Sequence, residues 1–133
     1  MDKLELRQYR GILREIEQLE AEKQRVLDSL LAPPNQVRQL QGRSGTDRIG
    51  EAVARRETYQ NLIDQKLDEL IALREQIESA IQGLPAEERR LMRLRYIDGL
   101  TWEKIAVALH YSIQHVWREH GRILQKMRDN ERV

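Results

Sequence analysis

Hydrophobic side chains recur along the first thirty residues at steps of three and four, or at multiples of these steps. The series is Tyr9, Ile12, Ile16, Leu19, Val26 and Leu30, and Lys23 holds the one position that is not hydrophobic. This spacing places side chains on one face of a helix, and its heptad form is typical of helices that pack lengthwise. It predicts a long amphipathic helix.

A second series with the same spacing follows between residues 49 and 84. It consists of Ile49, Ala52, Tyr59, Ile63, Leu70, Leu73, Ile77, Ala80 and Leu84, with Arg56 and Lys66 as interruptions. Further hydrophobic residues widen both stripes, namely Leu13, Leu27, Leu62, Leu67 and Ile81. Stripes of this width exceed the seam between two helices. Residues 1–83 are therefore predicted to form a helical hairpin or coiled coil that self-associates or binds a partner.

Residues 32–46 separate the two series and carry turn chemistry. Two consecutive prolines stop the first helix, and Gly42, Ser44 and Gly45 break any continuation. We expect a loop or flexible linker here. Its arginines fit either an arm that touches phosphate or a solvated surface, and the solvated surface is favoured.

Residues 84–133 are predicted to hold shorter helices. Pro85 suits the first position of a helix, and Glu87 and Glu88 suit the positive end of its dipole. Gly99 marks the end of this helix, because glycine takes the left-handed conformation that terminates helices.

Two more helices are expected after Gly99. Thr101 is placed to cap a helix that runs through Leu109, and a tight break follows at His110 and Tyr111. Ser112 is placed to cap a third helix, whose hydrophobic positions are Ile113, Val116, Ile123, Leu124 and Met127. Two helices joined by so short a turn form a helix-turn-helix, which presents its second helix to the major groove of DNA.

Composition fits an all-α fold. Charged residues make up 34% of the chain and aromatic residues 5%, with no phenylalanine. Such a chain buries thin hydrophobic stripes along helices, because it lacks the side chains for a thick core. We expect two domains: a helical hairpin in residues 1–83 and a DNA-binding domain in residues 84–133.

The sequence also bears on location. It contains no cysteine, which excludes disulfides and agrees with a reducing compartment. No run reaches the roughly 18 apolar residues of a membrane span, and the N-terminus lacks the apolar core of a signal peptide. We expect a cytoplasmic protein without a membrane partner.

Charge is distributed unevenly along the chain, although the net charge is only +1. Residues 84–133 hold ten basic against seven acidic side chains, whereas residues 51–83 hold four against seven. The basic excess coincides with the predicted helix-turn-helix. A phosphate-facing surface and a solvated helix face both account for it.

Catalytic and metal chemistry find little support. His110, His115 and His120 are five residues apart, a spacing that scatters them around a helix instead of converging on a metal. The acidic residues alternate with basic ones as on solvated helix faces. No glycine-rich phosphate loop is present. We predict a protein without catalytic activity, metal or cofactor.

Some of the tryptophans and histidines are predicted to pack in the core, and others to contact DNA or solvent. Trp102 follows the Thr101 cap, where it can cover the junction with the preceding helix, and His120 occupies a stripe position. Trp117 lies off the stripe, so a groove-facing role and dimer packing are both open. His115 is expected to meet phosphate or solvent.

Residues 84–127 resemble region 4 of the sigma-70 superfamily. The matching motifs are Leu84-Pro85, Arg93-Leu94-Arg95-Tyr96, Thr101-Trp102-Glu103-Lys104-Ile105-Ala106 and the helix that starts at Ser112. They cover about a third of the chain. The layout of the whole chain is similar to that of phage and prophage transcriptional regulators of the ArpU and RinA type.

The resemblance implies binding to promoter or operator DNA. Arg118 suits a guanine edge, Gln114 an adenine edge and Trp117 a thymine methyl group. The full set of expected DNA-contacting residues is Thr101, Lys104, Ser112, Ile113, Gln114, His115, Trp117, Arg118 and Arg122. Two departures bear on docking: His110 stands where many such turns have glycine, and an exposed Glu119 would repel phosphate. No segment resembles the region 2 that melts promoters.

We therefore expect a phage-type regulator in the cytoplasm of a bacterial host cell, acting on double-stranded DNA as a homo-oligomer, with a dimer favoured. RNA polymerase is a further candidate partner. Two alternatives remain open. A phage small terminase subunit would use a helix-turn-helix and oligomerising helices on packaging-site DNA, and a protein-interaction adaptor would use the same fold without DNA.

Overall fold

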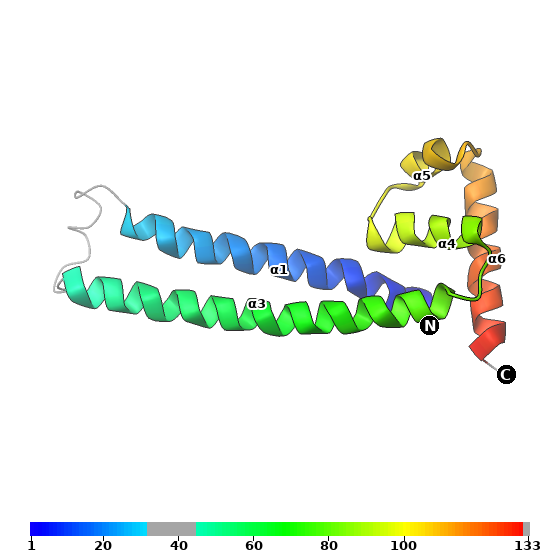
Figure 1. Ribbon diagram of the computed structural model, residues 1–133. Coiled ribbons are helices and arrows are strands. Elements are labelled where there is room, and N and C mark those ends of the chain that lie inside the picture. The colour runs from blue at the N-terminus through cyan, green and yellow to red at the C-terminus, as the bar shows by residue number, and fades with distance from the viewer. Residues whose placement is uncertain (32–44, 132–133) are drawn as a thin grey trace. The chain divides into compact units, whose positions relative to one another are not determined.

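The computed structural model describes residues 1–31 and 45–131, and every regular element among them is a helix (Figure 1). This confirms the predicted all-α class. The elements in chain order are the α-helices α1 (Lys3–Leu30), α3 (Gly45–Ile81) and α4 (Ala86–Met92), the π-helix η1 (Arg93–Ile97), and the α-helices α5 (Trp102–Leu109) and α6 (Ile113–Glu131). 

The chain forms two compact units, and the two long helices contribute to both. The hairpin unit is Arg14–Glu69, and the terminal unit combines Met1–Leu13 with Leu70–Val133. The boundary predicted between residues 83 and 84 thus falls inside the terminal unit. The start of α1 and the end of α3 share that unit with the shorter helices.

In the hairpin unit α1 and α3 run antiparallel, and two of the three predicted polar seam positions, Lys23 and Lys66, are bonded across the pair. Lys23 Nζ donates a hydrogen bond of 2.9 Å to Gln60 Oε1, and Lys66 Nζ lies 2.8 Å from a carboxylate oxygen of Glu15. Most of the hydrophobic seam is buried or half-buried between the helices. Ile49 is an exception, because its side chain is 51% exposed.

The predicted loop ends two residues too late. Gly45 is the first residue of α3 and Thr46 is the second, whereas both were assigned to the loop. Glycine destabilises a helix interior because it loses much conformational entropy there, and this cost is small at a helix terminus. Asp47 in the first turn also favours a helix start, because its negative charge suits the positive end of the helix dipole. Residues 32–44, with the two arginines of the expected arm, lie outside the described residues.

The terminal unit has its own hydrophobic core, to which all of its helices contribute. Its buried hydrophobic residues are Leu6, Tyr9, Leu70, Leu73, Ile77, Ile81, Leu84, Leu91, Met92, Tyr96, Ile105, Ala106, Val116, Ile123 and Met127. The core therefore draws on segments more than sixty residues apart in the chain.

The helix after the Gly83–Pro85 joint differs from expectation at its start and in its second half. Pro85 has a ψ of 155°, so it precedes the helix as its cap, not as its first residue. Its carbonyl oxygen still accepts the amide of Arg89 at 3.0 Å. The last turns are a π-helix, closed by a 2.9 Å bond from the Asp98 amide to the Arg93 carbonyl. Gly99 ends it with the predicted left-handed φ of 72°.

Candidate nucleic-acid interface

The turn between α5 and α6 is built from local hydrogen bonds. His110 has a left-handed φ of 59°. The amide of Tyr111 donates to the Ala106 carbonyl at 2.9 Å, and that of His110 donates to the Val107 carbonyl at 3.3 Å. This is the pattern of a Schellman motif, which ends a helix sharply. The predicted break at residues 110 and 111 is confirmed.

Both predicted caps are present. Thr101 Oγ1 accepts the amide of Lys104 at 3.3 Å at the start of α5. Ser112 Oγ accepts the amide of His115 at 3.1 Å at the start of α6. Each hydroxyl satisfies one of the amides that a helix start leaves without a partner, and Thr101 and Ser112 remain exposed.

One face of α6 is buried against the preceding helices. Val116, His120, Ile123 and Met127 form that face. Polar bonds at its margins join α6 to α4: Lys126 Nζ lies 2.6 Å from Glu88 Oε1, and the Tyr111 hydroxyl, just before α6, donates to Glu87 at 3.3 Å. Burial of this face determines which side chains α6 leaves exposed.

His120 occupies the centre of a buried aromatic and polar cluster. Its Nε2 lies 2.6 Å from the Tyr96 hydroxyl, and its ring meets the edge of the Trp102 ring at a centroid distance of 4.7 Å. The Arg95 guanidinium carbon lies 4.1 Å from the centroid of Trp102, a cation–π contact. The packing roles predicted for His120 and Trp102 are confirmed.

The same surroundings change the acidity of both hydrogen-bonded partners. Burial, together with the positive charges of Lys3, Arg95 and Arg7, lowers the pKa of His120 to about 4. Burial also raises the pKa of Tyr96. Both side chains are therefore uncharged at neutral pH, and the hydrogen bond between them joins two neutral groups.

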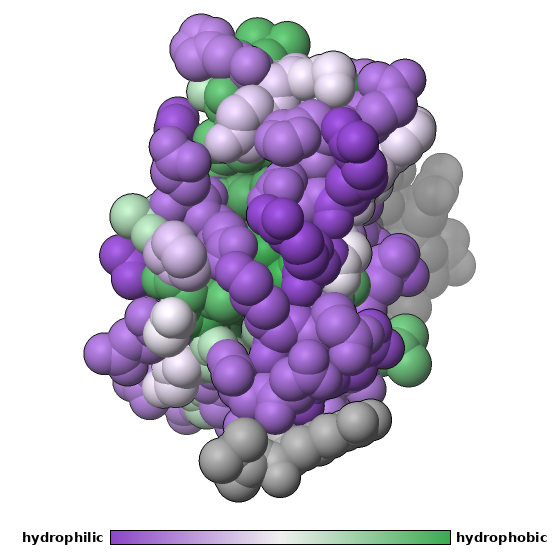
Figure 2. Space-filling model, turned by 90° about the vertical axis from the view of Figure 1, so that its right-hand side faces the viewer, coloured by the Kyte–Doolittle hydropathy of each residue, from purple (hydrophilic) through white to green (hydrophobic). Residues whose placement is uncertain are grey.

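The outer face of α6 presents three of the predicted base-contacting residues. Gln114, Trp117 and Arg118 are exposed, Trp117 to 50%. Neither Gln114 nor Arg118 has a side-chain polar partner among the described residues. The same is true of Lys104 on α5. The side of the molecule on which α6 lies is mainly hydrophilic (Figure 2).

The remaining predicted contact residues are less available. Ile113 and His115 are half-buried, and the His115 ring packs edge-on against Tyr111 at 4.4 Å. Arg122 Nη2 is ion-paired with Glu119 at 2.6 Å. This pair offsets the negative charge of Glu119, and it also occupies the guanidinium expected to meet phosphate.

Basic residues outside the predicted DNA-binding domain also belong to the terminal unit, which the sequence did not indicate. Lys3, Arg7 and Arg10 lie on one face of α1, in the part of that helix that belongs to the terminal unit. Arg10 Nη1 donates to the carbonyl of Ile97 at 3.1 Å. Their spacing of four and three residues indicates that they share one face of a helix. No feature of the nearby sequence indicates that this face lies beside residues 84–133.

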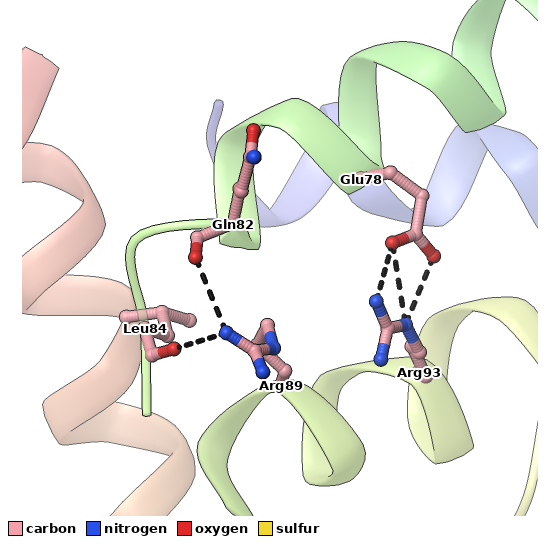
Figure 3. Close-up of polar contacts among 5 residues, drawn as sticks. All are labelled: Glu78, Gln82, Leu84, Arg89 and Arg93. Carbon is pink, nitrogen blue, oxygen red and sulfur yellow. Dashed lines mark hydrogen bonds and ion pairs between the residues drawn. The ribbon is translucent and has the colours of Figure 1, made fainter. Parts of the chain in front are cut away.

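Two arginines fasten the start of this region to the end of α3 (Figure 3). Arg89 Nη1 donates to the carbonyls of Gln82 at 3.3 Å and Leu84 at 3.0 Å. Arg93 binds Glu78 through both Nε and Nη2, with a shortest distance of 2.6 Å. The hydrogen bond from Arg93 lowers the pKa of the Glu78 carboxyl. The joint at residues 82–85 is thus held by side chains from α4 and η1.

Other chemistry is not apparent in the described part of the chain. Residues 1–31 and 45–131 hold no group of three or more side chains arranged to bind a metal ion. Within the same ranges, no helix is long and apolar enough to cross a membrane.

Fold and surface together define an all-α protein whose capped C-terminal helix exposes polar and aromatic side chains. The chain belongs to the DUF722 family, described as a protein of unknown function, whose model matches residues 35–129. No curated protein and no solved structure matches the chain. The family description names no activity, so DNA binding and the resemblance to sigma-70 region 4 stay predictions.

Proposed function

We propose that this protein binds double-stranded DNA sequence-specifically and regulates transcription without catalysis. The observation that carries the proposal is the outer face of α6. It follows a sharp three-residue turn, and it exposes Gln114, Trp117 and Arg118. A short turn before an exposed helix is the arrangement with which helix-turn-helix proteins enter a major groove.

The chemistry of these side chains suits the edges of base pairs. A guanidinium such as that of Arg118 donates two hydrogen bonds to guanine, and the amide of Gln114 matches adenine. Trp117 offers an apolar surface to a thymine methyl group. Around them, Lys104, Thr101 and Ser112 are exposed and suited to phosphate oxygens, which position a protein on DNA without reading its sequence.

A dimer completes the proposed mechanism. One recognition helix makes few base contacts, so a single half-site gives low affinity, whereas two linked helices bind two half-sites with a much higher effective affinity. Regulation would then follow from occupancy of a promoter or operator and from contact with RNA polymerase, as the resemblance to sigma-70 region 4 implies.

The experiment starts from selection of a preferred site out of random duplex DNA with the full chain. Fluorescence anisotropy then measures affinity for the selected and a scrambled duplex at several salt concentrations. Arg118→Ala should cost about 1–3 kcal/mol on the selected site and far less on the scrambled one. Arg128→Ala is the matched control, because it removes the same charge about 15 Å farther along α6.

Each other result counts against part of the proposal. Equal losses on both duplexes for Arg118→Ala would make Arg118 a phosphate contact, not a base reader. Absence of any salt-dependent binding to DNA would favour the adaptor alternative, since phosphate contacts always release counterions. Assembly into a closed ring in solution would favour the small terminase alternative.

A further inference from the structure

Five large hydrophobic side chains of α3 are exposed, and four of them lie on one face of that helix. These four are Ile49, Val53, Leu67 and Ile71, with exposed fractions of 51%, 49%, 38% and 57%, whereas Leu62 lies on another face. The steps between them are four, fourteen and four residues. Fourteen residues make just under four helical turns, so all four fall within about 40° of one another around the axis.

The sequence of this face is symmetric about Gln60. If a second α3 lies antiparallel with residue 60 opposite residue 60, Ile49 faces Ile71 of the other copy and Val53 faces Leu67. The same register places Arg56 opposite Asp64. Each contact occurs twice, as a twofold axis requires of an interface between identical chains.

The charged positions of this face are available for such pairing. Arg56 and Asp64 are both exposed. Arg56 has no polar partner among the described residues, while Asp64 accepts one bond from Gln60 Nε2 at 2.9 Å through Oδ1, which leaves its second oxygen open. In the symmetric register, opposite charges therefore meet on both sides of the axis.

The direction of the face also fits a second helix pair. Around α3, it lies roughly a quarter of a turn from the buried positions of the same helix, such as Ala52, Ile63 and Leu70. In a four-helix bundle each helix has two neighbours at about this angle. The stripe is thus wide enough for α1 on one side and another helix on the other.

We propose that α3 is the self-association surface of this protein, pairing antiparallel with α3 of a second copy in the register centred on Gln60. The proposal specifies the dimer that the proposed function includes, and it is tested without DNA, so a failure of DNA recognition leaves it standing. The interface is defined by Ile49, Val53, Arg56, Gln60, Asp64, Leu67 and Ile71.

Charge exchange tests the register directly. Sedimentation velocity of the full chain measures the dimer dissociation constant of the wild type, Arg56→Asp, Asp64→Arg and the double variant. Each single change puts like charges opposite each other twice, so the constant should rise on the order of tenfold. The double variant restores both pairs and should return within about threefold of the wild type.

Controls separate register from folding and from general charge. Arg25→Asp makes the same charge change at an exposed position of α1 and should leave the constant unchanged. Circular dichroism checks that each variant keeps its helix content. A monomeric or ring-forming wild type, single variants that dimerise normally, or a double variant that stays dissociated would each overturn the proposal.

Discussion

Acid should weaken the terminal unit through protonation of His120. The ring is 6% exposed, and burial and nearby positive charges lower its pKa from 6.5 to about 4. An unfolded chain therefore takes up this proton at a higher pH than the folded one does. The contribution of His120 to stability is present above pH 6.5 and is lost as the pH falls toward 4.

The magnitude follows from the size of the pKa shift. A difference of one unit corresponds to about 1.4 kcal/mol, so the full shift makes the free energy of unfolding fall by at most about 3 kcal/mol across this range. Urea unfolding at pH values between 7.5 and 4.5 measures it. Fluorescence of Trp102, which packs on the His120 ring, reports on the same site as the titration.

His120→Gln isolates the effect, because glutamine can bond Tyr96 but does not titrate. This variant should be less stable than the wild type at pH 7, since it loses the ring contact with Trp102, yet its stability should vary much less between pH 6.5 and 4.5. His115→Gln should keep the wild-type dependence. A wild-type stability that stays constant over this range, or an unchanged slope in His120→Gln, would refute the reasoning.

Two further predictions concern the left-handed residues. Gly99→Ala should lower stability by about 1–2 kcal/mol, because φ is +72° and a Cβ would lie 2.5 Å from the Arg10 guanidinium; thermal unfolding of Gly99→Ala and of Arg10→Ala/Gly99→Ala tests this, and full rescue by the second change would contradict a backbone cause. His110→Gly should raise stability by about 0.5–1 kcal/mol, because glycine removes the left-handed strain at some cost in unfolded-state entropy. A loss of stability on urea unfolding would count against that strain.

Local sequence determined much of the architecture. The caps at Thr101 and Ser112, the break at His110 and the left-handed Gly99 depend on bonds between residues at most a few positions apart, so their signals are complete within a short window. The heptad series likewise located both long helices. Burial of His120 followed from helical periodicity, because a position on the apolar stripe faces the core wherever the helix packs. The packing of Trp102 followed from its place beside the Thr101 cap.

The tertiary structure alone decided what the helices pack against. The bond from Arg10 to the Ile97 carbonyl joins residues 87 positions apart, and it brings the basic face at the start of α1 into the terminal unit. The exposure of Ile49 could likewise not be predicted, because a heptad pattern indicates on which face of the helix a side chain lies but not whether a partner covers that face. Contacts between residues far apart in the sequence depend on how the whole chain folds, and the spacing of neighbouring residues does not determine them.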